Sequence, residues 1–142
     1  MFSHILLASD GSECALKAAE TAATVAAMFT SRLTVLNVFK PAPYIGAFEA
    51  PLELGLEPKY IAEMQDDAIR STGRILKDHA VPFDCKTEIG FPSDEIIRTA
   101  EAEHCDLIIM GSRGLSGIKS LVLGSVSDQV THHAHCPVLI VK

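Results

Sequence analysis

The sequence predicts an α/β fold, a Rossmann-like three-layer sandwich in which helices cover both faces of a five-stranded parallel sheet. Short apolar runs alternate with segments of helical periodicity in the order β-α-β-α-β-α-β-α-β, and this order is typical of a parallel sheet. Residues 106–111 and 137–142 are almost continuously apolar, as expected of strands that are buried on both faces.

The composition indicates one ordinary globular domain over residues 1–142, with 48% hydrophobic and 21% charged residues. The net charge is −6 and Lys and Arg form no dense cluster, which argues against a surface for nucleic acid or an anionic membrane. No stretch approaches the ~20 apolar residues of a membrane span. The start of the chain lacks the basic region of a signal peptide, so we expect a cytoplasmic protein.

The first half of the chain predicts two strands and two helices. Residues 4–9 and 33–39 are the strands, and the helix between them places small side chains on one face, which lets it lie close to a sheet: Ala15, Ala19, Ala22 and Ala26, followed by Phe29. The stretch Asp10-Gly-Ser-Glu13 fits a capping box with Asp10 as the N-cap. Residues 40–57 hold three prolines and two glycines and predict a long loop. A helix then runs from Pro58 to about His79.

The second half predicts three more strands, separated by two helices. Residues 81–90 alternate in polarity, so this strand is expected to be half exposed. Ser93 is the expected N-cap of the next helix. The chain then continues with a strand, a glycine-rich loop, a helix and a last strand, at residues 106–111, 111–124, 125–135 and 137–142.

The glycine-rich loop is the main functional signal. Gly111 and Gly114 are followed, after nine residues, by Gly124-Ser125. A strand end without a Cβ atom and a helix start with free N–H groups form a typical phosphate cradle. Ser125 is the expected N-cap of this helix, with Asp128 as its capping-box partner. The hydroxyls of Ser125 and Ser127 are expected to be within reach of a phosphate. The P-loop and the dinucleotide GxGxxG motif are both absent. The alternative is that these glycines, with Gly117, only shape a tight connection.

This pattern resembles the ATP-binding signature of the universal stress protein (UspA) family. The first strand and helix, the strand 33–39, the turn 88–97 and the last two strands also resemble that family, so the likeness covers nearly the whole chain. The resemblance implies an adenine nucleotide alpha hydrolase-like fold and an ATP site with Mg²⁺ or Mn²⁺ bound through the phosphates. Its residues would be Ala8, Ser9, Asp10, Val38, Met110, Gly111, Arg113, Gly114, Gly124, Ser125 and Val126.

Two positions depart from the family pattern. Ala8 stands where many ATP-binding relatives have Pro, and Asn37 stands where His is common. The family likeness also implies a homodimer in which the last strands, 137–142, meet across a twofold axis.

Other reactive side chains suggest no further site. The four cysteines share no CxxC spacing and are expected to be reduced and partly buried. The cluster His132, His133, His135 and Cys136 lacks distant partner ligands, so we expect no metal site there.

The sequence favours an ATP-binding stress-response or regulatory protein over an enzyme. It supplies no evident general base or arginine finger, so at most slow ATP hydrolysis is expected. The alternatives are a nucleotide hydrolase or nucleotidyl-transfer enzyme on the same fold, and an interaction protein that binds no nucleotide. In the leading hypothesis, bound nucleotide switches the 41–57 loop or the dimer surface.

Overall fold

A computed structural model describes residues 1–40, 58–114 and 123–142 of the chain. Nine elements follow one another in the predicted alternation: β1 His4–Ala8, α1 Glu13–Phe29, β2 Arg32–Phe39, α2 Pro58–Asp78, β3 Asp84–Ile89, α3 Pro92–Ala102, β4 Leu107–Gly111, α4 Ser125–His133 and β5 Val138–Val141. The predicted loop 41–57 and the bend at Gly117 lie outside the described residues.

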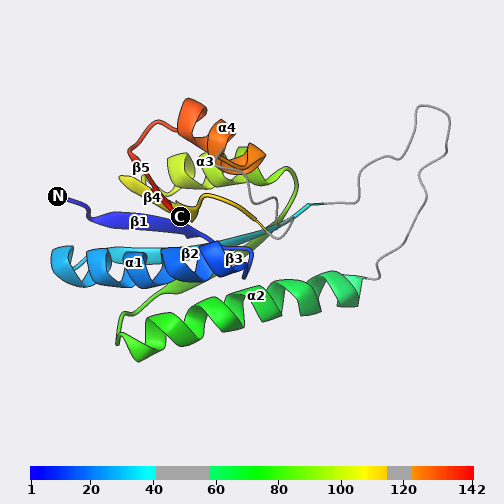
Figure 1. Cartoon of the computed structure of the whole chain (residues 1–142), viewed down its shortest axis with the longest axis horizontal. Helices are drawn as coiled ribbons and strands as arrows, with labels where there is room; N and C mark the ends of the chain where they lie inside the picture. Colours follow the sequence, from blue (N-terminus) through cyan, green and yellow to red (C-terminus); the bar gives the residue numbers. More distant parts are fainter. Residues whose placement is uncertain (41–57, 115–122) are drawn as a thin grey trace, which may run out of the picture.

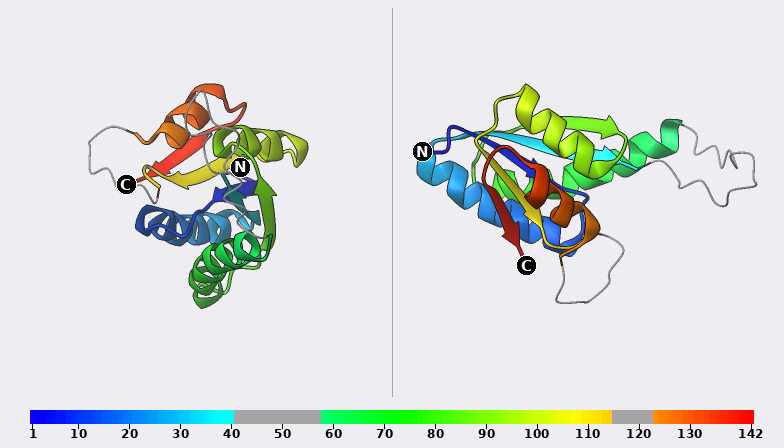
Figure 2. Two further views of the ribbon diagram at one scale, coloured as in Figure 1. Left: turned by 90° about the vertical axis from the view of Figure 1, so that its right-hand side faces the viewer. Right: turned by 90° about the horizontal axis from the view of Figure 1, so that it is seen from above.

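The five strands form one parallel sheet in the order β3-β2-β1-β4-β5. Helices α1 and α2 cover one face of it, and α3 and α4 cover the other (Figure 1). The left view of Figure 2 shows the same three layers from the side, and the right view looks onto α3 and α4 with the sheet behind them. The predicted fold class is therefore confirmed.

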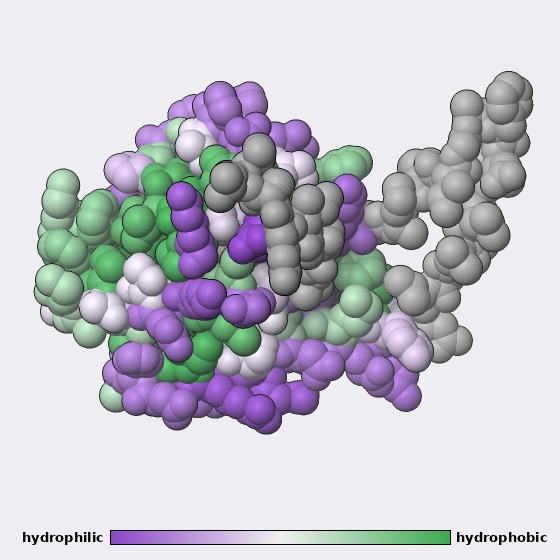
Figure 3. All heavy atoms as spheres, viewed as in Figure 1, coloured by the Kyte–Doolittle hydropathy of each residue, from purple (hydrophilic) through white to green (hydrophobic). Residues whose placement is uncertain are grey.

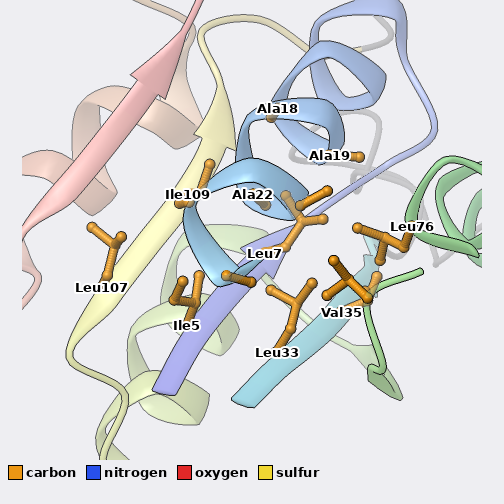
Figure 4. Close-up of a cluster of buried hydrophobic side chains, with 13 residues drawn as sticks. Ile5, Leu7, Ala18, Ala19, Ala22, Leu33, Val35, Leu76, Leu107 and Ile109 are labelled. Carbon is orange, nitrogen blue, oxygen red and sulfur yellow. The ribbon is translucent and has the colours of Figure 1, made fainter. Parts of the chain in front are cut away.

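The core between the sheet and α1 is built from large side chains on the strands and small ones on the helix. Figure 4 shows strand residues such as Leu7 and Ile109 pointing at the alanine face of α1. Four alanines of that face are fully buried: Ala18, Ala19, Ala22 and Ala23. Phe29, predicted to continue the face, is 40% exposed instead. The small side chains let α1 approach the sheet closely, as the sequence predicted.

A second core lies on the opposite face, where α3 and α4 pack on the sheet. Its buried members come from three strands, two helices and one loop: Leu6, Ala8, Leu36, Ile96, Ala100, Cys105, Ile108, Met110 and Val130. Ser93 of α3 donates a hydrogen bond to the side chain of Gln129 in α4, at 2.6 Å. This bond ties the two helices of the layer together.

Three predicted helix caps are wrong. Ser12, not Asp10, caps α1, because its hydroxyl accepts a hydrogen bond from the N–H of Ala15. Phe91, not Ser93, is the N-cap of α3, since Pro92 occupies the first helical position that proline prefers. Gly124, not Ser125, is the N-cap of α4, and no side chain makes a capping bond there. The predicted capping boxes are therefore not formed.

The two edges of the sheet differ in chemistry. β3 is exposed along most of its length and carries Asp84, Lys86 and Glu88, so the predicted half-buried strand is wrong and Cys85 is exposed. It is more exposed than predicted because α2 and α3 pack mainly on β2 and not on β3. β5, at the other edge, holds only Val, Leu and Ile, and Leu139 is 38% exposed.

Hydrophilic side chains gather on the outer surface of α2, along the bottom of the molecule in Figure 3. This helix turns its charged side outward and buries a mixed face that includes Gln65 and Thr72. None of the helices in the described part of the chain is long and apolar enough to cross a membrane.

Candidate nucleotide site

A cavity of about 470 Å³ opens at the carboxyl ends of β1, β2 and β4. The order of the sheet reverses between β1 and β4, so the chain leaves these neighbouring strands toward opposite faces. Crevices at such switch points are the usual ligand sites of parallel sheets. The cavity volume lies within the range of ordinary small-molecule sites.

All eleven residues expected from the sequence line this one cavity: Ala8, Ser9, Asp10, Val38, Met110, Gly111, Arg113, Gly114, Gly124, Ser125 and Val126. They come from three strand ends, the glycine loop and the start of α4. The structure thus brings together residues that are more than 100 positions apart in the sequence.

Ser9 is held in place by the elements around it. Its N–H donates to the carbonyl oxygen of Leu36 at 2.9 Å, and its own carbonyl accepts from the side-chain amide of Asn37 at 2.9 Å. Its hydroxyl lies 2.7 Å from that of Thr72 in α2. Asn37, one of the departures from the family pattern, therefore ties the end of β2 to the end of β1.

Asp10 stands beside the glycine loop. One carboxylate oxygen, Oδ1, accepts a hydrogen bond from the N–H of Ser12 at 2.9 Å, which orders the turn into α1. The other oxygen, Oδ2, would lie 2.8 Å from a Cβ atom built on Gly114. Asp10 therefore lies next to the glycine loop, and it is Ser12 that caps α1.

Gly111 is needed for packing inside the protein. A Cβ atom on Gly111 would lie 2.8 Å from the carbonyl carbon and the Cβ of Cys14, and 3.0 Å from the N of Ala15. This glycine therefore lets β4 approach the first turn of α1. The sequence predicts a role for this glycine in ligand access, and the structure shows a further role in packing against Cys14 and Ala15.

The start of α4 forms the side of the cavity best suited to an anion. The first hydrogen bond of the helix joins the N–H of Asp128 to the carbonyl oxygen of Gly124, at 2.9 Å. The N–H groups of Ser125, Val126 and Ser127 consequently have no acceptor within the helix. Together with the helix dipole, such groups attract phosphate.

The hydroxyl of Ser127 makes hydrogen bonds that hold this helix start. Its hydroxyl is buried and lies 2.9 Å from the carbonyl oxygen of Ser112 and 3.0 Å from that of Gly124. The N–H of Gly124 also donates to Ser112, at 2.8 Å. Ser127 also lines the cavity, so contact between its hydroxyl and a phosphate stays a prediction, and the Ser125 side chain is exposed.

Several lining residues were missed by the sequence analysis. Helix α2 contributes Met64, Gln65 and Ala68, and α3 contributes Pro92 and Ile96. Lys40 follows β2 and is a second cationic residue of the lining, in addition to Arg113. Gln65 offered a signal, because it is a polar residue on the inward face of an amphipathic helix; its amide donates to the carbonyl oxygen of Glu88 at 3.0 Å.

The histidines near the carboxyl end of α4 make separate contacts. Nδ1 of His132 lies 2.9 Å from the carbonyl oxygen of Asp128, and Nδ1 of His133 lies 3.0 Å from that of Gln129. His135 pairs with Glu101. These contacts direct the three rings to different partners.

Known proteins match the chain along its whole length. The universal stress protein family matches residues 1–142. A universal stress protein of Thermus aquaticus is 39% identical over 145 residues, which cover 100% of both chains. Universal stress protein MJ0531 of Methanocaldococcus jannaschii is 31% identical over 142 residues, which cover 100% of this chain and 83% of that protein.

Solved structures share the fold. UspA from Lactobacillus plantarum has a TM-score of 0.83 at 24% identity, and the match covers 99% of this chain and 98% of that one. A universal stress protein in complex with cAMP has a TM-score of 0.74 at 23% identity, covering 99% and 97% of the two chains. One from Archaeoglobus fulgidus in complex with dAMP has a TM-score of 0.71 at 18% identity, covering 100% and 98%. From the family match and the curated relatives, the chain belongs to the universal stress protein family.

Proposed function

We propose that this chain binds ATP in the cavity at the ends of β1, β2 and β4, and that it acts as a nucleotide-binding stress-response or regulatory protein. The observation that carries the proposal is the start of α4, where three N–H groups without intrahelical acceptors border a cavity of about 470 Å³. The apolar part of the lining includes Leu36, Val38 and Met110, which suits the faces of an adenine ring.

The class of ligand is supported by two relatives. The universal stress proteins solved with cAMP and dAMP hold adenine nucleotides. We extend this class to ATP because the cavity here has both a helix start and two cationic side chains, Arg113 and Lys40, for a longer phosphate chain. Asp10 also lines the cavity, and its carboxylate is the type of ligand that Mg²⁺ or Mn²⁺ takes beside phosphates.

The binding site is tested by replacing Ser125 with proline. Proline is favoured at the first helical position, and the preceding Gly124, with φ −63° and ψ 159°, has the conformation that precedes proline. Ser125→Pro removes the N–H and the hydroxyl together, while Ser125→Ala removes the hydroxyl alone. Calorimetric titration with Mg²⁺-ATP is expected to give affinity at least about tenfold weaker for Ser125→Pro, and a smaller loss for Ser125→Ala.

Urea unfolding of both variants provides the control, since the exposed Ser125 makes no capping bond whose loss would destabilise the helix. Equal ATP affinity in Ser125→Pro and the wild type would remove the helix start from the site. No binding of ATP, ADP, AMP, cAMP or dAMP at millimolar concentration would favour the interaction-protein alternative. Rapid release of ADP or AMP would instead favour an enzyme.

We also propose that two chains associate through β5. This strand is an apolar edge, and such an edge is stabilised when it is covered. An isologous twofold pairing is the simplest way for one chain to cover its own edge.

A further inference from the structure

Three ligand-type side chains converge at the end of the sheet opposite to the nucleotide cavity. His4 begins β1, Glu103 follows α3, and Cys105 lies just before β4. One ligand atom from each of these residues lies within 4.8 Å of the other two. His4 and Cys105 are each only 8% exposed. The cluster is therefore built from three parts of the fold and is largely shielded from water.

The hydrogen bonds of His4 fix which ring nitrogen faces this cluster. Nδ1 lies 3.0 Å from the backbone carbonyl oxygen of Glu103, and a carbonyl oxygen can only accept, so Nδ1 carries the hydrogen. Nε2 lies 3.6 Å from Oε2 of Glu103. Histidines that ligate metals commonly donate their other N–H to a carbonyl or carboxylate in this way, which orients the ring.

Around His4 Nε2 there are more hydrogen-bond acceptors than hydrogens to donate to them. The hydroxyl of Thr34 lies 2.9 Å from Nε2 and 3.1 Å from Oε2 of Glu103. This hydroxyl has a single hydrogen, so it can donate to only one of the two acceptors. The other acceptor needs a proton on Nε2 or a cation between the two groups.

Glu103 is suited to hold such a cation. Partial burial opposes its charge, but the hydrogen bonds from Lys86 and Thr34 and the charge of Lys86 outweigh this and lower its pKa. Glu103 is thus a carboxylate near neutral pH. With a thiolate at Cys105, it supplies two negative charges to balance one divalent ion.

We propose that His4, Glu103 and Cys105 bind one zinc-class divalent ion. An imidazole, a carboxylate and a thiolate are the three ligand types that Zn²⁺ takes in proteins. A water molecule or the Thr34 hydroxyl completes the coordination. Since burial raises the pKa of Cys105 to about 12, its S–H bond breaks as the sulfur–metal bond forms, and one proton leaves for the solvent.

Lys86 sets the affinity of this site. Its ammonium pairs with Oε1 of Glu103, and its side chain is 45% exposed, so it adds a positive charge beside the proposed ion. This charge repels a metal ion. Lys86→Gln is therefore expected to bind the ion several-fold more tightly, whereas a purely structural role for the cluster predicts no gain.

Cobalt(II) is the probe for the test, because a cobalt–thiolate bond gives a near-ultraviolet charge-transfer band that other ligands do not give. The reduced wild-type chain is expected to bind one Co²⁺ with this band, and Zn²⁺ is expected to displace it. Cys105→Ser is expected to abolish the band, and Glu103→Gln to weaken binding at least about tenfold. Cys136→Ser is the matched control, since Cys136 is a half-buried thiol outside the ligand group, and it is expected to keep the band.

Far-ultraviolet circular dichroism of each variant checks that it is folded. The tighter metal binding expected for Lys86→Gln is a further check, because this variant keeps all three proposed ligands. Absence of the band in the wild type at millimolar Co²⁺ would overturn the proposal. Retention of the band in folded Cys105→Ser would do the same. Cobalt binding that disappears only when His132, His133 and His135 are replaced would assign the ion to those surface histidines instead.

Discussion

At the residue scale, two glycines of the same loop have different jobs. A methyl group on Gly111 would overlap the backbone of Cys14 and Ala15, which cannot move without shifting α1. A methyl group on Gly114 would meet Oδ2 of Asp10, at 2.8 Å, which is a side-chain atom and not part of the backbone. Gly111 therefore contributes to stability, whereas Gly114 leaves room for the side chain of Asp10.

We expect Gly111→Ala to lower the free energy of unfolding by about 1–3 kcal/mol, and Gly114→Ala to lower it by less, because only a side-chain atom would have to shift. Urea denaturation of both variants measures the difference. Nucleotide affinity should fall in Gly114→Ala, because the displaced carboxylate borders the cavity. Similar unfolding midpoints for the two variants would contradict this division of roles.

At the element scale, α1 depends on the small size of its buried side chains. Ala22 is fully buried against the sheet, while Ala27 lies on the exposed side of the same helix. Ala22→Leu is expected to cost about 1–3 kcal/mol of stability through overpacking. Ala27→Leu, with nearly the same helix propensity, is the control and should be close to neutral. Thermal unfolding checks both, and an equal effect of the two would mean that α1 does not pack tightly.

The sequence was a good guide to which elements exist and a poor guide to where the helices begin. Periodicity identified all nine elements, because burial on a sheet imposes it. The prediction of the α1 cap was wrong because two candidate residues, Asp10 and Ser12, both precede the helix. The chain makes a left-handed turn at Gly11, with φ +77°, and the helix then begins directly after Ser12. Pro92 did carry a usable signal against Ser93 as the cap, since proline prefers the first helical position.

The site was predictable where it follows from local motifs, and unpredictable where it depends on distant packing. Glycine spacing and family likeness identified residues from the ends of three strands, and all of them line one cavity. The wall supplied by α2 was missed, because no local pattern says which side of a crevice a helix will border. The cluster of His4, Glu103 and Cys105 was missed for the same reason, since its members are brought together by the sheet.

At the scale of the whole molecule, the proposed pairing through β5 makes a prediction about size in solution. Leu139 is 38% exposed on the edge strand, so Leu139→Lys places a charge where the partner strand would lie. Sedimentation velocity is expected to give a dimer for the wild type and a monomer for this variant. Met28→Lys, at a 73% exposed position on α1, should remain a dimer. A monomeric wild type at micromolar concentration would argue against the pairing.

The contrast between the two edges of the sheet limits how far association can proceed. β3 carries three charged residues, and Arg32 engages Asp84 at 3.2 Å across its start, so a strand added there would have to displace solvated charges. β5 carries none. Two copies joined edge to edge through β5 would therefore leave only charged rims at both ends. Growth into a filament would have no second apolar edge to use, so the proposed association would stop at two chains.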